Sequence, residues 1–553
     1  MAGFDEEFDF VVVGSGGGSM CAALLLRQAG KSVVILEKTE QVGGSTARAG
    51  GVMWIPNNRF MAPAGVEDSP EKAAAYLDAV VGNGNDSPGA TRERRAAYIR
   101  EATKMVDFLV DRGIELERSP RWPDYYDDRD GGSAPGRTVV AKLFDVNQLG
   151  PWKDKLRANK FVVPVIIHEA VLLPLVKVSW PAKWVAAKMV LRGLYAKLTG
   201  KHYVTAGAAL QGRMLQAALR AGTEIRTDAP VREIVLDGNR VTGVAIDTPQ
   251  GQRRIGAKLG VLLNAGGFAR NQAMLDEHIP EVSAEWTHVA PGDTGDMHRE
   301  LTRIGAWMAQ MDEMVGNQMT VPPGCDEPAG IQMQLAKPHA FLVDQTGIRY
   351  MNEGGSYMEF CQRIIARNRI APAIPSWWIM DTDFLSKHML AETLPGVNKP
   401  KSWTETGYLK QGETIEELAQ ACGIDPAALR KTTDTFNRFA QQGRDEEFHR
   451  GDREYDKWLG DPTNKPSPAL GTVARGPFYA VPVVPGNVGT FGGVVTDCDA
   501  RALREDGSVI EGLYATGTTS AAVMGRTYPG AGCSIGPSFT WGYVAALHAL
   551  GRR

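Results

Sequence analysis

The chain has 553 residues, more than one hydrophobic core usually holds, so we expect at least two domains. Hydrophobic residues make up 43% of the sequence and charged residues 23%, which excludes a disordered chain and a polytopic membrane protein. The formal net charge of -3 gives no overall positive field, so we expect no nucleic-acid partner.

The N-terminus and the cysteines favour a cytoplasmic location. The segment from Met1 to Glu7 is short and acidic, without the basic and apolar regions of a secretory signal. The six cysteines stand singly, and no two have the spacing of a metal site or a redox pair. We therefore expect reduced thiols and no metal site.

The first predicted elements, from Phe8 to Glu37, form a β–α–β unit. A short apolar strand ends at Gly14, a helix follows over 20–28, and a second strand covers 32–36. The glycine-rich turn suits a dinucleotide, because Gly14 permits a tight bend and Gly16 lets the backbone approach a pyrophosphate. Ser19 stands where the usual GxGxxG motif has its last glycine, and the Glu37 carboxylate would bind a ribose. The expected cofactor contacts in this unit are Gly14, Gly16, Gly17, Gly18, Ser19, Glu37 and Lys38.

A second glycine-rich run follows over 43–51. Such a run brings backbone amides against a second phosphate or a flavin ring. FAD needs this second contact, whereas NAD does not. The expected contacts are Gly43, Gly44, Ser45, Thr46, Ala49, Gly50 and Gly51.

The segment from Pro151 to Lys201 combines a long apolar stretch, 161–178, with many cations and three tryptophans. Its apolar stretch is interrupted by Pro164, His168, Glu169 and Pro174, so a transmembrane helix is not expected. Trp152, Trp180 and Trp184 stand among ten basic residues. Only Asp154 and Glu169 oppose these cations, which gives the segment a local net charge of +8. The basic residues are Lys153, Lys155, Arg157, Lys160, Lys177, Lys183, Lys188, Arg192, Lys197 and Lys201. This pattern favours a helix pair at a membrane interface; a buried helical hairpin is the alternative.

Two further stretches complete the nucleotide-binding fold. Residues 203–267 predict a helix over 210–221 and strands at 224–226, 231–235, 241–246 and 261–264, an antiparallel meander that returns to a parallel strand. Residues 486–553 predict a last parallel strand, 513–517, and a closing helix, 535–550. The remaining expected cofactor contacts are Val231, Ala265, Gly266, Gly517, Ser534 and Ile535. The amides at the start of the closing helix would face the flavin's pyrimidine edge.

The fold class expected from these elements is α/β, with a discontinuous Rossmann-type FAD-binding domain and an inserted α+β substrate domain. We place the first part of the FAD-binding domain at 1–315, with the basic and apolar insertion at 151–203. The substrate domain covers 316–484, including helices at 415–421 and 426–441, and the second part of the FAD-binding domain covers 485–553.

The glycine turns, together with Asn264–Gly267 and Ala515–Gly517, resemble the flavoprotein subunits of fumarate reductases and succinate dehydrogenases. Relatives that attach FAD covalently carry a histidine in the glycine run. Ser45 and Thr46 stand there in this chain, so the resemblance implies non-covalent FAD.

Three tyrosine-containing segments narrow the resemblance. They are Gly347–Tyr357, Met524–Gly532 with its Tyr-Pro-Gly-Ala-Gly sequence, and Pro123–Tyr126, which precedes Gly136-Arg137. These resemble the 3-ketosteroid Δ1-dehydrogenases over nearly the whole chain except the 151–201 insertion.

That resemblance implies a mechanism. The Tyr528 hydroxyl and the Gly532 amide would bind the ketone oxygen at carbon 3, while Tyr357 removes a proton from carbon 2. Hydride from carbon 1 would reduce FAD, and a quinone or another acceptor would reoxidise it. A tyrosine has a pKa near ~10, so Tyr357 needs a donor that favours its phenolate. Tyr125 or Tyr126 would supply that donor; the sequence does not choose between them.

Four other readings stay open. A Δ4-(5α)-dehydrogenase would use similar ketone contacts. A reductase of the fumarate or urocanate type would need a cationic clamp, for which Arg349 and Arg526 are the candidates. A non-catalytic sterol binder would keep FAD as a relic. If 151–201 contacts the inner face of a membrane, the substrate would be a sterol-derived ketone such as cholest-4-en-3-one.

Overall fold

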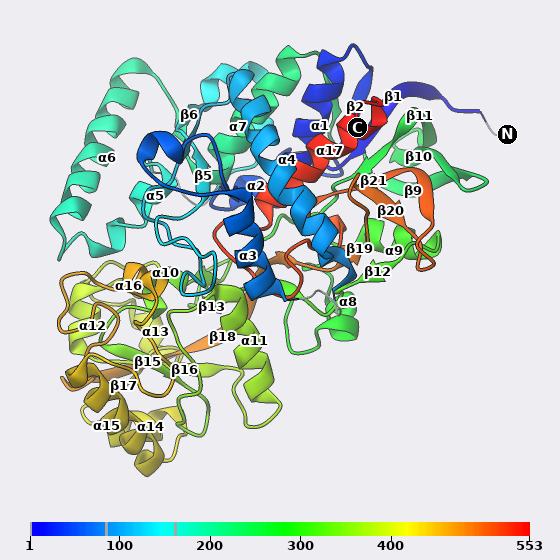
Figure 1. Ribbon diagram of the computed structural model, residues 1–553. Helices are drawn as coiled ribbons and strands as arrows, with labels where there is room; N and C mark the ends of the chain where they lie inside the picture. Colours follow the sequence, from blue (N-terminus) through cyan, green and yellow to red (C-terminus); the bar gives the residue numbers. More distant parts are fainter. Residues whose placement is uncertain (1–2, 83–86, 160–162) are drawn as a thin grey trace.

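A twisted sheet built from distant parts of the chain forms the upper half of the molecule in Figure 1. The computed structural model describes residues 3–82, 87–159 and 163–553. Within this part of the chain the sheet has eight strands in the order β20-β21-β10-β11-β1-β2-β8, with β9 paired to β10. The strands are β1 (Glu6–Val13), β2 (Val33–Leu36), β8 (Glu224–Arg226), β9 (Val231–Asp237), β10 (Arg240–Thr248), β11 (Gly251–Leu263), β20 (Arg501–Leu503) and β21 (Val509–Ala515).

The directions of these strands agree with the expected nucleotide-binding topology. β1 pairs in parallel with β2 and β11, and β21 runs parallel to β11. β9, β10 and β11 form the antiparallel meander expected from the sequence. The apolar second half of β1, Phe10–Val13, and the whole of β2 are buried at the centre, as parallel strands covered on both faces must be.

Helices from both ends of the chain cover this sheet. α1 (Gly17–Gln28) packs against α17 (Ile535–Ala549) and α7 (Ala206–Arg220), and α4 (Arg92–Asp111) contacts α17. α1 and α7 begin three and four residues before the expected positions, because their first turns are small residues with no apolar periodicity. The other helices of this half are α2 (Gly44–Arg48), α3 (Pro70–Val81), α5 (Ile167–Ala170), α6 (Trp180–Thr199), α8 (Gln272–His278) and α9 (Asp296–Arg303).

A second, antiparallel sheet lies below the first in Figure 1. Its strands are β13 (Met314–Thr320), β14 (Ala329–Gly330), β15 (Ala340–Val343), β16 (Ser376–Met380), β17 (Lys410–Gly412) and β18 (Phe478–Thr490). It is accompanied by α10 (Gln332–Leu335), α11 (Tyr357–Asn368), α12 (Thr382–Lys387), α13 (Lys401–Glu405), α14 (Ile415–Cys422), α15 (Pro426–Gln442) and α16 (Glu454–Leu459). β13 starts before residue 316 and β18 continues past 484, so the sheet crosses both expected domain boundaries, which stay predictions.

In the part of the chain that the structure describes, three small sheets lie outside the two large ones. β3 (Val52–Trp54), β4 (Leu116–Arg118) and β5 (Thr138–Ala141) form one small sheet, β6 (Phe144–Asp145) pairs with β7 (Tyr203–Val204), and β12 (Met308–Ala309) pairs with β19 (Gly493–Val494). β3 directly follows the second glycine run, so it connects the predicted cofactor contacts to the rest of the site.

Candidate active site

The turn between β1 and α1 leaves no room for a side chain. Gly14 has a φ of 89°, and a Cβ there would lie 2.2 Å from the carbonyl oxygen of Asn264. Gly16 is the N-cap of α1 and has no side chain to satisfy the first amides of the helix. The side-chain oxygen of Asn264 accepts from the Gly18 and Ser19 amides at 3.3 and 3.0 Å, so the amides of the turn ahead of Gly18 are the ones open to an anionic group such as a pyrophosphate.

The next residues of the turn have a different role. An added Cβ would lie 1.9 Å from the Phe539 ring at Gly17, and 2.3 Å from the Ser538 carbonyl oxygen at Gly18. Ser19 is fully buried, and its Oγ lies 3.0 Å from the side-chain amide of Asn264. Gly17 and Gly18 thus allow α17 to approach α1, a packing role that the sequence did not reveal.

The carboxylate at the end of β2 is buried and oriented. Glu37 Oε2 accepts a hydrogen bond from Ser15 Oγ at 2.5 Å. The amide of Ala229 donates to the Glu37 carbonyl at 2.9 Å, which places Val231, the first residue of β9, beside this corner. The Lys38 ammonium turns away and binds Asp296 at 2.7 Å.

The second glycine run lies against the first. Gly43 and Gly44 both have positive φ, and a Cβ on Gly44 would meet only Gly16, at 3.8 Å from its Cα. Ser45 Oγ accepts a hydrogen bond from the Ala290 amide at 2.9 Å. A Cβ on Gly51 would lie 2.4 Å from the Ala206 backbone carbon, so the end of the run packs on the start of α7. Thr46 and Ala49 also contact the start of α7. The Ala49 carbonyl accepts a hydrogen bond from the Gly207 amide at 3.0 Å, and a Cβ on Gly207 would lie 1.9 Å from the Thr46 carbonyl oxygen. Gly50, between Ala49 and Gly51, is half-buried.

The last predicted cofactor contacts lie at the other end of the glycine-lined site. The Ala265 amide donates to Thr519 Oγ1 at 2.9 Å, and Gly266 has a φ of 82°. A Cβ on Gly517 would lie 2.5 Å from the side-chain amide group of Asn264. A cavity lined by Gly517, Ser534 and Trp541 continues from here toward the closing helix.

These residues fit FAD. Two glycine turns face each other across a space that a Cβ would fill, and a helix N-terminus opens onto it. Within the described part of the chain, both amide atoms of the buried Gln211 lack a hydrogen-bond partner, and this side chain lies beside Gly43. An extended diphosphate with polar edges would satisfy such groups.

Three tyrosines from distant segments form one buried cluster. The ring centroids of Tyr357 and Tyr528 are 4.9 Å apart, and Tyr125 lies 5.4 Å from Tyr357 and 6.1 Å from Tyr528. Their exposed fractions are 1%, 8% and 3% for Tyr125, Tyr357 and Tyr528. Tyr357 is the first residue of α11, whereas the other two lie in loops.

Backbone contacts hold this cluster together. The Tyr125 amide donates to the Pro529 carbonyl at 2.8 Å, and the Tyr76 hydroxyl donates to the same oxygen at 2.6 Å. Ser356 Oγ, at the N-cap of α11, is 3.4 Å from the Tyr528 carbonyl oxygen. The two loops and the start of α11 are therefore fixed relative to one another by contacts to the main chain as well as by the rings.

The loop that carries Tyr125 is built on a buried ion pair. Arg137 donates to Asp124 at 2.5 Å and to Asp68 at 2.7 Å, and Trp54 Nε1 donates to Asp124 at 2.8 Å. A Cβ on Gly136 would lie 1.7 Å from the Trp122 carbonyl oxygen. The Gly136-Arg137 sequence thus positions the tyrosine loop and does not contact the cluster itself.

Tyr125 and Tyr126 have different surroundings. Tyr125 packs in the cluster and stacks on Tyr455, with ring centroids 4.2 Å apart. The Arg453 guanidinium lies 5.0 Å from the centre of the Tyr126 ring. Burial raises the pKa of Tyr126, and the nearby Glu359 carboxylate raises it further.

Gly532 and Ser534 complete the site beside Tyr528. Gly532 has a φ of 99°, and a Cβ there would lie 2.5 Å from the Val52 carbonyl oxygen in β3. The Ser534 amide donates to the Tyr528 hydroxyl oxygen at 3.2 Å, and Ser534 Oγ lies 3.0 Å from that oxygen. Ile535 follows as the first residue of α17. The hydrogen bonds of Ser534 thus orient Tyr528, and its contact with the flavin stays a prediction.

The pKa shifts run opposite to what a resting phenolate requires. Burial raises the pKa of Tyr357 well above its ordinary value, and Tyr125 and Tyr528 raise it further. Burial raises the pKa of Tyr528 to about 12, although hydrogen bonds from Ser534 and Tyr357 lower it. Both phenols are therefore protonated at neutral pH.

Two residues that sequence reasoning missed extend the cluster. Tyr455 in α16 is fully buried against Tyr125, and Gln332 Nε2 donates to its hydroxyl at 3.0 Å. No motif surrounds either residue. Only spatial proximity reveals them.

The basic insertion divides into two parts. Arg157 and Asn159 are both buried. Arg157 donates to Thr39 Oγ1 at 2.7 Å, and Asn159 donates to the Ala49 carbonyl at 2.9 Å, so this first part of the insertion supports the cofactor loops. Lys160 and the beginning of the 161–178 stretch lie outside the described residues. The described remainder forms α5 and the 20-residue α6, so the expected helix pair has one very short member. No helix that the structure describes has an apolar stretch sufficient to cross a bilayer.

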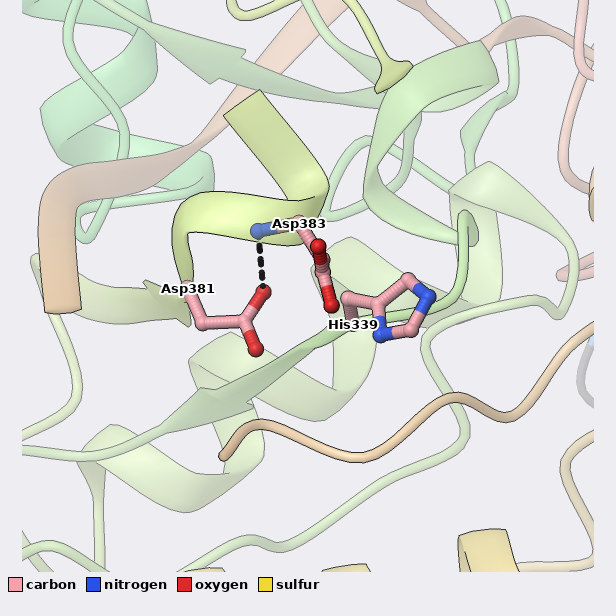
Figure 2. Close-up of side chains that lie close together, drawn as sticks. All are labelled: His339, Asp381 and Asp383. Atoms are coloured by element: carbon pink, nitrogen blue, oxygen red, sulfur yellow. Dashed lines mark hydrogen bonds between the residues drawn. The ribbon is translucent and has the colours of Figure 1, made fainter. Parts of the chain in front are cut away.

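One histidine–aspartate cluster lies far from these residues in the chain. Figure 2 shows His339, Asp381 and Asp383 grouped around the start of α12. The two oxygens of Asp381 accept the amides of Asp383 and Arg475, among others, while Lys387 Nζ lies 3.2 Å from His339 Nε2. A lysine and main-chain amides already satisfy this cluster, which caps a helix.

Comparison with known proteins places this site in a family. Residues 9–535 match the FAD binding domain family. The chain is 37% identical to the 3-oxosteroid 1-dehydrogenase of Mycolicibacterium smegmatis, covering 98% of this chain and 97% of that protein. It is 32% identical to the 4-oxocyclohexanecarboxylate 2-dehydrogenase of Sinomonas cyclohexanicum, over 99% and 93% of the two chains.

A solved structure agrees over the whole fold. The 3-ketosteroid Δ1-dehydrogenase of Sterolibacterium denitrificans, in complex with 1,4-androstadiene-3,17-dione, matches with a TM-score of 0.92 and 32% identity, covering 99% of this chain and all of that chain. FAD is therefore the cofactor for which the two glycine turns are built. The chain belongs to the FAD binding domain family and, within it, to the group of flavoenzymes that includes the 3-oxosteroid 1-dehydrogenases.

Proposed function

We propose that this chain is an FAD-dependent 3-ketosteroid Δ1-dehydrogenase. The observation that carries the proposal is the convergence of Tyr125, Tyr357 and Tyr528 beside Gly532, at the end of a glycine-lined cofactor cradle. Similarity to 3-oxosteroid 1-dehydrogenases over nearly the full chain supports the same reaction.

Tyr528 and Gly532 are placed to bind the ketone oxygen. The Ser534 amide donates to the Tyr528 hydroxyl oxygen, which leaves the phenol proton free to point at a substrate carbonyl. Among the described residues no acceptor is found for the Gly532 amide, so it can donate as well. Two donors aimed at one oxygen stabilise the enolate that forms as carbon 2 loses its proton.

Tyr357 is the proposed base, with Tyr125 as its partner. Because burial keeps Tyr357 protonated at rest, its hydroxyl proton has to leave to solvent before the resulting phenolate takes the proton from carbon 2. Tyr125, which packs against Tyr357 and stacks on Tyr455, is the phenol placed to donate to that phenolate and so to stabilise it. Tyr126, beside Glu359 and Arg453, is not given this role.

FAD, when bound, supplies the acceptor for the hydride from carbon 1. Ser45 and Thr46 offer no histidine for a covalent link, which supports non-covalent binding. A quinone or another small oxidant is the proposed final acceptor.

The arginines nominated for a carboxylate clamp are already neutralised, which disfavours a fumarate-type reductase. Arg349 is buried and paired with Glu353 at 2.8 Å and Asp445 at 2.6 Å. Arg526 is paired with Asp312 at 2.8 Å and Glu313 at 2.9 Å. The similarity to a Δ4-(5α)-dehydrogenase of Rhodococcus jostii, 21% identical with a TM-score of 0.69, extends to the fold alone.

Anaerobic mixing tests the proposed function. A 4-ene-3-ketosteroid should bleach the oxidised flavin spectrum and yield the 1,4-diene, whereas succinate should leave the spectrum unchanged. 4-Oxocyclohexanecarboxylate is the matched competitor, because it offers the same ketone chemistry on a single ring. Faster bleaching by that acid, or a product unsaturated at carbon 4 from a saturated ketone, would overturn the assignment.

We infer a peripheral membrane contact through α6, at the inner face of the membrane. Trp180 and Leu198 at its two ends are 79% and 86% exposed, and α6 carries four cations but no carboxylate. The other large exposed apolar side chains of the helix are Trp184, Val190, Leu191, Leu194 and Tyr195. This combination suits an interface with anionic lipid, which would also dissolve a sterol-derived ketone such as cholest-4-en-3-one.

The double variant Trp184→Glu/Leu191→Glu should bind phosphatidylglycerol vesicles at least tenfold more weakly than the unaltered protein, measured by flotation, because two carboxylates enter the apolar face. Deleting 151–201 is a poorer test, since Arg157 and Asn159 support the cofactor loops. Ile370→Glu, at a residue 80% exposed elsewhere on the surface, is the matched control. Equal flotation of all three proteins would contradict the contact.

A further inference from the structure

A loop of the lower half of the molecule lies against the start of α6. A Cβ added at Gly396 would be 2.3 Å from Lys177 Nζ, three residues before Trp180. The Gly396 amide donates to the Leu385 carbonyl at 2.8 Å, which ties this loop, 389–400, to the end of α12. The loop and the N-terminal end of α6 therefore form one continuous surface.

Two large apolar side chains project from that loop. Leu394 is 58% exposed and Val397 is 55% exposed, on either side of Gly396. Exposing such side chains to water is unfavourable, and here they extend the apolar face that begins with Trp180. The approach of Gly396 to Lys177 thus brings exposed apolar residues of two distant segments to the same edge of the protein.

Two cations lie at the same edge. Lys399 Nζ donates to Thr393 Oγ1 at 2.7 Å and to the Leu394 carbonyl at 3.2 Å. Burial, together with the neighbouring Lys177 ammonium, lowers the pKa of Lys399 to about 8. No carboxylate is among the groups that shift the pKa of Lys399, and Glu392 is the one acid in the loop. Two close cations without an acid favour an anion between them.

We propose that loop 389–400 is a second membrane anchor, in which Leu394 and Val397 enter the lipid beside Trp180 while Lys177 and Lys399 bind the phosphate of an anionic phospholipid. The inference rests on the membrane contact of α6 proposed above. It adds that both halves of the enzyme contact the same bilayer. Lipid fits better than a protein partner, because a phosphate plane above an apolar layer matches the cations and apolar side chains at once.

Vesicle flotation distinguishes the membrane contact of α6 from the second anchor at loop 389–400. Leu394→Ser/Val397→Ser should bind both phosphatidylglycerol and phosphatidylcholine vesicles about tenfold more weakly, because apolar insertion is lost on both. Lys177→Gln/Lys399→Gln should lose about tenfold on phosphatidylglycerol and little on phosphatidylcholine, because only the charge term is removed. Ile370→Ser is the matched control, and unchanged flavin absorbance reports folding.

The outcomes are distinguishable. If the α6 variant loses binding while both loop variants float like the unaltered protein, the second anchor is wrong and the α6 contact stands. If the unaltered protein does not float at all, both ideas fail. If the loop variants instead convert a dimer to a monomer in light scattering without altering flotation, a second copy of the chain covers this surface and the lipid assignment is overturned.

Discussion

Tyr357→Phe is expected to slow flavin reduction by a 3-ketosteroid about 10³-fold, and Tyr528→Phe about 10²-fold, with FAD bound as before. The first change removes the proposed proton acceptor, and general acid–base groups contribute ~10²–10⁴ in rate. The second removes one of two donors to the ketone oxygen, a loss of ~10²–10³. Anaerobic stopped-flow measurement of flavin bleaching reports the chemical step directly.

Tyr350→Phe is the control for these variants. Its hydroxyl contacts Ser376 Oγ at 2.6 Å, away from the cluster, and it belongs to the same Gly347–Tyr357 segment. The control should reduce flavin at the unaltered rate. Bleaching rates within twofold of the unaltered enzyme for both Tyr357→Phe and Tyr528→Phe would remove the mechanism, although the similarity to the dehydrogenases would remain.

Gly532→Ala is expected to reduce the rate of flavin reduction by about 10²-fold. The new Cβ would lie 2.5 Å from the Val52 carbonyl and 2.6 Å from the Trp54 amide nitrogen, both main-chain atoms of β3. The strand or the Gly532 amide must move, and a displacement of about 1 Å in a positioning group costs roughly 10²-fold. Because β3 follows the second glycine run, a weaker flavin spectrum is also expected.

Gly113→Ala provides the matched control for backbone strain. Gly113 has a φ of 83°, close to that of Gly532, but a Cβ there meets nothing within 4 Å. Both variants should lower the melting temperature, since each forces alanine into a left-handed conformation. Only Gly532→Ala should lose activity; an equal loss in Gly113→Ala would show that strain, rather than amide position, is responsible.

The nucleotide-binding half was predictable because its signals are local. The strand that ends at Gly14, the glycine turn and the carboxylate of Glu37 follow one another within a single β–α–β unit, so hydrophobic pattern and turn chemistry specify them together. The meander over β9, β10 and β11 was predictable for the same reason. The limits of the second sheet were not, because β13 and β18 pair across more than 150 residues of sequence.

The sequence by itself determined the cofactor class, because its glycine turns specify FAD, and it predicted the chemical types in the site: phenols and a glycine amide for a ketone. Only the tertiary structure decided which groups meet. It placed Tyr125 rather than Tyr126 against Tyr357, turned Ser534 toward Tyr528, brought Tyr455 behind Tyr125, and paired Arg349 and Arg526 with carboxylates. The physical reason is that two adjacent tyrosines have the same local propensity. Main-chain contacts such as Tyr125 to Pro529, some 400 residues away in sequence, decide which one packs against Tyr357.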